Sequence, residues 1–141
     1  MRWMMKRARK LAIALGSPRQ WRGLLRHRVL AGNEHRPVLD PRLRTVIDIG
    51  ANRGQFALAA RTKLPAARII SFEPLAVPAA VFRAVFSGDD NIQLHPVAVG
   101  ARTARLPMNV SARDDSSSLL DMAQTHSACY PGTETVGKIE V

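Results

Sequence analysis

The chain has 141 residues and a formal net charge of +10, and no apolar run in it reaches the ~18 residues that a membrane span requires. Its length suits a single domain, and Cys129, the only cysteine, excludes an internal disulfide and gives no sign of an oxidising compartment, so we expect a cytoplasmic protein. The basicity belongs to the N-terminus, because residues 1–41 carry ten Lys and Arg against two acidic residues, whereas residues 42–141 carry eleven against nine.

Residues 1–33 read as a basic helical arm. Within residues 1–15, Met4, Ala8, Leu11 and Leu15 recur at helical spacing and arginines and lysines occupy the other side. A second basic helix is predicted over residues 18–31, with an apolar side formed by Trp21, Leu24, Leu25, Val29 and Leu30.

Several roles stay open for this arm. A basic amphipathic helix can lie on an anionic membrane surface, act as a targeting peptide, or pack its apolar side on the domain with its charges in water. No aromatic interleaving or recognised nucleic-acid motif accompanies the charges, so we expect no nucleic-acid partner. Residues 32–44 then look like a linker, within which a short helix at 38–43 is possible.

The stretch from residue 45 to residue 64 reads as a strand, a tight turn and a helix. A β-branched apolar run at 45–49 leads into a glycine-rich bend, and a helix-forming segment follows at 55–64. In such a unit, glycine lets the backbone approach a ligand closely, and the new helix presents unpaired N–H groups at its start. The pattern predicts a nucleotide-cofactor site at the carboxyl end of the first strand.

The spacing within the turn distinguishes between cofactors. A dinucleotide fingerprint needs glycine at its first, third and sixth positions, where this chain has Gly50, Asn52 and Gln55. The arrangement of Asp48, Gly50 and Gly54 instead resembles the first motif of class I S-adenosylmethionine-dependent methyltransferases. A carboxylate suits that ligand, because it carries an amino-acid moiety and a sulfonium cation in place of phosphates. The alternative interpretation is that this strand and its Gly-x-x-x-Gly turn bind no ligand.

An acidic residue closes the second predicted strand. Residues 68–73 are another short apolar run, which ends in Glu73 and is stopped by Pro74. In a parallel nucleotide-binding sheet, an acid at this place accepts hydrogen bonds from the ribose hydroxyls, typically ~20 residues beyond the glycines. Glu73 lies 19 residues beyond Gly54, so we predict that it binds a ribose.

The alternation of helices and strands continues towards the C-terminus. We predict a helix over residues 78–86 and a third strand over residues 92–99, whose carboxyl end would bring Val97, Ala98 and Val99 to the adenine ring. Next come an edge strand over residues 103–110 and a polar loop at 111–120, which either covers the site or lies in solvent. A further strand begins at residue 137.

Four blocks follow one another as in the FkbM-type methyltransferases: residues 48–56, 72–74, 95–100 and 116–120. The resemblance runs from about Glu34 to the C-terminus. It implies an α/β fold in which residues 34–141 form the S-adenosylmethionine-binding domain. The sheet would be the first half of a Rossmann-like class I methyltransferase sheet, truncated at the C-terminus, because family members continue through further strands. The implied reaction is O-methylation of a hydroxyl on a sugar, polyketide or related small metabolite, which would be the partner substrate.

The resemblance also assigns cofactor residues. Asp48, Gly50, Asn52 and Gly54 would cradle the methionine part of S-adenosylmethionine, and Glu73 would hold the ribose. The sequence marks no catalytic residue, and its four scattered histidines predict no metal site. The predicted cofactor-binding set is completed by Ala51, Gln55, Pro74, Ala98 and Val99.

Two other classes of function stay open. An NAD-dependent oxidoreductase would share the strand, turn and helix and the ribose acid, although Asn52 and Gln55 count against it. A non-catalytic module would be either a degenerate half-domain or a protein that contacts membranes peripherally through the basic arm. Such a module would bind no cofactor, and in the second case it would lose vesicle affinity without residues 1–31.

Overall fold

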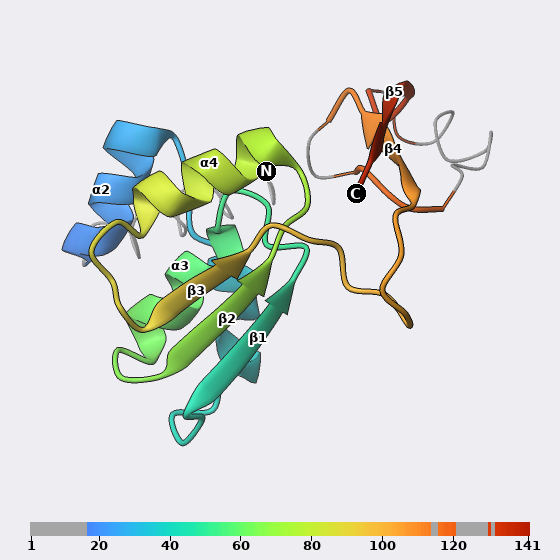
Figure 1. Ribbon diagram of the computed structural model, residues 1–141. Helices are drawn as coiled ribbons and strands as arrows, with labels where there is room; N and C mark the ends of the chain where they lie inside the picture. Colours follow the sequence, from blue (N-terminus) through green and yellow to red (C-terminus); the bar gives the residue numbers. More distant parts are fainter. Residues whose placement is uncertain (1–16, 114–115, 121–129, 131) are drawn as a thin grey trace. The chain divides into compact units, whose positions relative to one another are not determined.

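The computed structural model describes residues 17–113, 116–120, 130 and 132–141 (Figure 1). They fall into two compact units, the first ending at Pro96 and the second beginning at Val97. The helix predicted over residues 1–15 lies outside the described residues. The first unit is mixed α/β with a parallel sheet, so the α/β prediction is confirmed at that level.

The sheet of the first unit has three parallel strands in the order β1-β2-β3. Both connections run through a helix, as parallel pairing requires (Figure 1). The first two strands were predicted correctly to within one residue, because each is a short β-branched run closed by glycine or proline. The elements are β1 (Thr45–Ile49), α3 (Gln55–Lys63), β2 (Arg68–Phe72), α4 (Ala76–Val85) and β3 (Ile92–His95).

The third strand is shorter than predicted. It was expected to span residues 92–99, but β3 ends at His95. Pro96 has no N–H to offer the ladder, so parallel pairing with β2 stops where the proline begins. Residues 98 and 99 therefore lie beyond the sheet and belong to the second unit.

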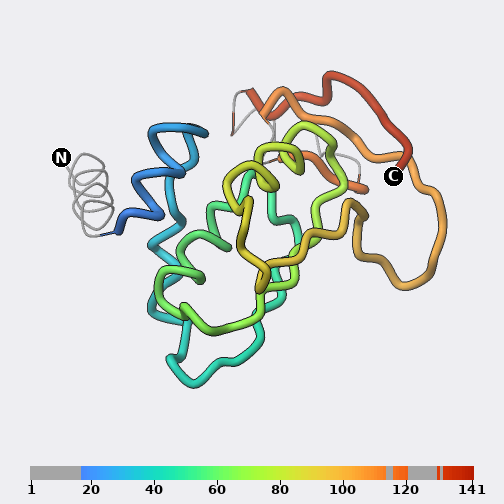
Figure 2. Tube along the Cα trace, turned by 60° about the vertical axis from the view of Figure 1, so that its left-hand side comes forward, coloured from blue at the N-terminus to red at the C-terminus, as the bar shows by residue number. Residues whose placement is uncertain are grey.

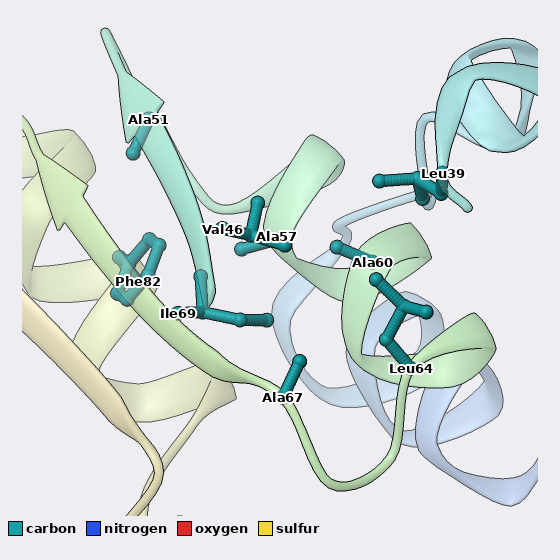
Figure 3. Close-up of a cluster of buried hydrophobic side chains, with 9 residues drawn as sticks. All are labelled: Leu39, Val46, Ala51, Ala57, Ala60, Leu64, Ala67, Ile69 and Phe82. Carbon is teal, nitrogen blue, oxygen red and sulfur yellow. The ribbon is translucent and has the colours of Figure 1, made fainter. Parts of the chain in front are cut away.

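The core of the first unit lies on both sides of α3. On the sheet side, Ala57 and Ala60 pack with Val46 of β1, Ile69 of β2 and Phe82 of α4 (Figure 3). On the other side, a second cluster contains four buried residues: Val29, Ala31, Leu58 and Ala59. Because α3 is enclosed on two sides, its residues 57–61 are all buried.

Helix α2 (Pro18–His27) packs against α3 and α4. The prediction of a helix over residues 18–31 was too long, because Arg28 adopts a left-handed conformation (φ 57°) that ends it. The predicted apolar side was also partly wrong, since Leu25 is 72% exposed while Gln20 and Gly23 are buried. A Cβ on Gly23 would lie 2.8 Å from Leu58, so glycine here permits the close approach of α2 to α3.

The segment between α2 and β1 holds a short helix, but not at residues 38–43. It is the 3-10 helix η1 (Asn33–Val38), which lies beside α3 (Figure 2). Asn33 is buried and exchanges two hydrogen bonds with Gln20 of α2, at 3.1 and 3.2 Å. This polar pair ties the start of η1 to the buried side of α2.

The second unit contains an antiparallel pair of strands, β4 (Pro107–Ser111) and β5 (Thr135–Glu140). The edge strand predicted over residues 103–110 therefore starts four residues later than expected, at the proline. The strand predicted from residue 137 begins two residues earlier. Within the loop predicted at 111–120, Ser118 forms an isolated bridge with Asn109.

Candidate functional site

The predicted site residues of the first unit gather where β1 and β2 end. Asp48 lies near the end of β1, the turn 50–54 follows it, and Glu73 comes directly after β2. The register places Asp48 opposite Ser71 and Ile49 opposite Phe72, so the two strands end side by side. Gln55 begins α3 and Pro74 follows Glu73, which completes the group of residues expected at this edge.

The backbone N–H groups of the turn are all used within the protein. Those of Gly50 and Ala51 donate to the carbonyl of Phe72, at 3.0 and 2.9 Å. The N–H of Asn52 donates to Oε2 of Glu73 at 2.8 Å. The N–H of residue 53 donates to Oδ1 of residue 52, and the N–H of residue 54 donates to the carbonyl of residue 51. A pyrophosphate site requires a nest of free N–H donors, and residues 50–54 of this turn do not provide one.

The carboxylate of Glu73 joins the turn to the start of the following segment. Its Oε2 accepts from Asn52, and its Oε1 accepts from the N–H of Leu75 at 2.9 Å. The residue is only 5% exposed. Each carboxylate oxygen has a second lone pair, so Glu73 can still accept from two hydroxyl groups.

Asp48 is a buried carboxylate with an unused acceptor. It is 7% exposed, and its Oδ2 has no hydrogen-bond partner among the described residues. The pKa of Asp48 is raised from its ordinary 3.8 to about 6, chiefly by burial and also by the charge of Glu73, while His35 opposes the shift. A cation beside Asp48 would lower this pKa and relieve its repulsion with Glu73.

Ser71 adds a second unsatisfied group on the same side of the sheet. Its Oγ is fully buried and has no hydrogen-bond partner within the described residues, and Ser71 pairs with Asp48 in the β1–β2 register. Buried polar atoms normally find a partner in the protein, in water or in a ligand. Two buried polar atoms that lack a partner among the described residues therefore lie on paired strands at this edge.

The two glycines of the turn have different roles. Gly50 has φ 77°, and a Cβ added to it would meet nothing within 4 Å, so its surroundings are open to a ligand. Gly54 has φ 91°, but a Cβ there would lie 2.5 Å from Phe86 and 3.0 Å from Phe82. Gly54 is therefore needed for packing of the turn on α4. Ala51, also predicted to bind cofactor, is buried in the hydrophobic core.

The remaining predictions are placed as follows. Ala98 and Val99 lie in the second unit, half-buried and 47% exposed respectively, and their contact with the adenine ring stays a prediction. His35 was treated as one of four scattered histidines, yet its charge acts on Asp48 and its ring meets Phe56 edge-on at 5.6 Å. No motif signals it, because its place depends on how η1 packs beside α3.

Comparison with known proteins gives no assignment. No model of a protein family and no curated protein matches the chain. Within residues 17–113 and the other described parts, no three His, Cys, Asp or Glu side chains cluster as metal ligands. In the same parts of the chain, no helix combines the length and apolar character needed to cross a membrane.

Proposed function

We propose that the chain is an S-adenosylmethionine-binding methyltransferase of the FkbM type, whose acceptor is a hydroxyl of a sugar, polyketide or related small metabolite. One observation carries the cofactor proposal: the edge formed by β1 and β2 offers carboxylate acceptors while the N–H donors of its turn are already used. Such an edge suits a ligand that brings donors and positive charge better than it suits a pyrophosphate, because residues 50–54 offer no free N–H group. The same observation disfavours the NAD-dependent alternative.

The residues present fit the groups of the cofactor. Asp48, with its unpartnered Oδ2, would receive the ammonium group of the methionine part, and Ser71 lies opposite it on β2. Glu73 would accept from the ribose hydroxyls with the lone pairs that Asn52 and Leu75 leave free. The positive end of the α3 dipole, at Gln55, suits the carboxylate of the methionine part.

The chemistry itself asks little of these residues. When bound, S-adenosylmethionine supplies a methyl group that its sulfonium already activates. The chain must then fix the cofactor and align an acceptor hydroxyl, and alignment alone can supply a large part of a rate enhancement. The parallel sheet and its helices are compatible with the first half of a Rossmann-like methyltransferase sheet, which accounts for the position of Asp48 and Glu73 at its carboxyl edge.

Calorimetric titration of the full chain tests the proposal. S-adenosylmethionine and S-adenosylhomocysteine should bind saturably, and Asp48→Asn should weaken S-adenosylmethionine binding about tenfold or more, the loss expected for one charge-assisted hydrogen bond. Asp90→Asn, the same change at an exposed position of the first unit, serves as the matched control. An absence of binding by a chain that circular dichroism shows to be folded would refute the proposal, and displacement by NAD would favour the oxidoreductase.

Once binding is established, the acceptor class can be tested separately. Transfer of a labelled methyl group should be assayed against a panel of hydroxylated sugars and polyketides, with amine analogues of the same compounds as controls. Transfer to hydroxyl compounds alone supports the O-methyltransferase assignment. Transfer to the amines instead would refute that part and leave the cofactor site intact.

A further inference from the structure

A second site lies within the helical layer of the first unit. It is a pocket of about 110 Å³ enclosed by α2, by the C-terminal part of α3 and by the end of α4 with the turn after it. This volume is well above the ~15 Å³ that a single water needs. Leu58 and Phe86 form part of its apolar wall, and its charged lining consists of Arg19, Arg22, Arg61 and Asp89.

Arg61 is the decisive residue, because it is a fully buried charge with an unused donor. It is 1% exposed, and its Nη1 donates to the carbonyls of residues 64, 65 and 67, at 3.3, 3.0 and 2.7 Å. Its Nε lies 2.9 Å from Oδ2 of Asp89 and forms an ion pair with it, but the geometry of this contact is not that of a hydrogen bond. Its Nη2 has no hydrogen-bond partner in the part of the chain that the structure describes. A buried guanidinium normally satisfies all its donors, and Arg61 lines the pocket, so an acceptor bound there would supply the partner that Nη2 lacks.

The charge of the pocket points to the kind of acceptor. Asp89 is the only carboxylate in the lining, and it is shared by Arg61 and by Arg19, which approaches Oδ2 at 3.0 Å. Arg22 forms no ion pair or hydrogen bond with any described residue. Three guanidiniums against one carboxylate leave an excess of two positive charges around the pocket. Arg61 is buried, whereas Arg22 is exposed and the side chain of Arg19 is 59% exposed, so the pocket has a buried charge at its inner end and two charges at its solvent side.

We propose that this pocket binds a phosphate monoester group, with Arg22 and Nη2 of Arg61 as its ligands. Guanidinium forks match the tetrahedral oxygens of phosphate better than a point charge does, and the dianion would neutralise the two excess positive charges. No residue of this pocket belongs to the carboxylate edge of β1 and β2, so the two sites select ligands of opposite charge. The phosphate group can come from a soluble phosphate ester or from the headgroup of a phosphatidic-acid membrane.

The test uses the full chain and inorganic phosphate as the probe. Arg22 is the residue to change, because Arg61 also supports three carbonyls and its loss would disturb folding. Arg22→Gln should weaken phosphate binding about tenfold in calorimetric titration. Arg26→Gln is the matched control, since Arg26 is exposed on the same helix and lies outside the pocket lining. It removes the same charge and should change the affinity less than twofold.

A second measurement follows Arg61 directly. In ¹⁵N-resolved NMR of the Arg side chains, phosphate should shift the Nε–H signal of Arg61, identified by its absence in Arg61→Lys. Equal loss of affinity in Arg22→Gln and Arg26→Gln would mean general attraction to a basic helix and would overturn the proposal, as would an unshifted Arg61 signal at saturating phosphate. With the site established, competition between phosphate and phosphatidic-acid vesicles separates a membrane source from a soluble one.

Discussion

Replacing Asp48 by asparagine gives a quantitative test of the electrostatics at the carboxylate edge. Burial and the charge of Glu73 raise the pKa of Asp48 from 3.8 to about 6 in the folded protein. The pKa of this carboxyl group is higher in the folded protein than in the unfolded chain. Its contribution to the free energy of unfolding is therefore largest below the pKa of the unfolded chain, and it is lost as the pH rises through the pKa of the folded protein. Asparagine stays uncharged at every pH. The free energy of unfolding of Asp48→Asn should therefore rise relative to that of the unmodified chain as the pH increases.

The size of the effect follows from the shift. A difference of about two pKa units at ~1.4 kcal/mol each sets an upper limit of about 3 kcal/mol for the relative gain, reached above about pH 7. The gain should fall towards zero below about pH 4, where the carboxyl is protonated in both states. Any fixed cost of the new amide group is independent of pH, so the pH dependence of the difference isolates the charge.

Urea unfolding followed by tryptophan fluorescence measures this difference from about pH 4 to about pH 8. Trp21 on α2 reports on the first unit, and Asp90→Asn controls for the substitution at an exposed position. A difference between Asp48→Asn and the unmodified chain that stays constant within about 0.5 kcal/mol over this range would refute the reasoning. The affinity for S-adenosylmethionine should rise over the same pH range, because only the ionised carboxylate attracts a cationic ligand.

Three further substitutions probe the packing that supports the two sites. Glu73→Gln should destabilise the first unit by about 1–3 kcal/mol in urea unfolding, because an amide keeps only one acceptor oxygen for the two N–H groups that Glu73 now binds. Gly54→Ala should lower the free energy of unfolding by about 1–3 kcal/mol because of the positive φ at this residue, and the clash of the new Cβ with Phe86 should lower it further. Adding Phe86→Leu to the same chain should recover part of the loss. Arg61→Lys keeps the charge but loses the fork, so thermal unfolding should show a loss of about 2–3 kcal/mol, and unchanged stability would contradict the role of its three carbonyl bonds.

The sequence predicted the β1–β2 edge well for a physical reason. Parallel strands joined by a helix bring their carboxyl ends together whatever their surroundings, so an acid at the end of each strand suffices to predict that Asp48 and Glu73 are close. The same argument placed Ala98 and Val99 on the third strand, and that placement was wrong because the strand ends before Pro96. The missing N–H of that proline ends β3 four residues early.

Which residues of the helices are buried could not be predicted in the same way. Periodicity identifies a helix that buries one side, but α3 is buried from residue 57 to residue 61 in succession, because it lies between the sheet and α2. On α2, the buried side is formed by Gln20 and Gly23, which apolar counting ignores. Gln20 can be buried because its side-chain amide forms hydrogen bonds with Asn33. Gly23 is buried because the side chain of Leu58 occupies the position that a Cβ would take. Both reasons depend on partners distant in the sequence.

The two proposed sites make opposite demands on a ligand, and this separates their tests. Asp48 and Glu73 present negative charge to a ligand that brings donors, whereas Arg22 and Arg61 present positive charge to a ligand that brings acceptors. A phosphate ion that entered the carboxylate edge would meet two like charges and no free N–H within residues 50–54, so we expect it to compete poorly with S-adenosylmethionine there. Saturating phosphate should therefore leave the S-adenosylmethionine affinity unchanged in the Arg22→Gln chain. Competition between the two ligands in that chain would mean that the turn offers donors after all, and the acceptor character on which the cofactor proposal depends would be wrong.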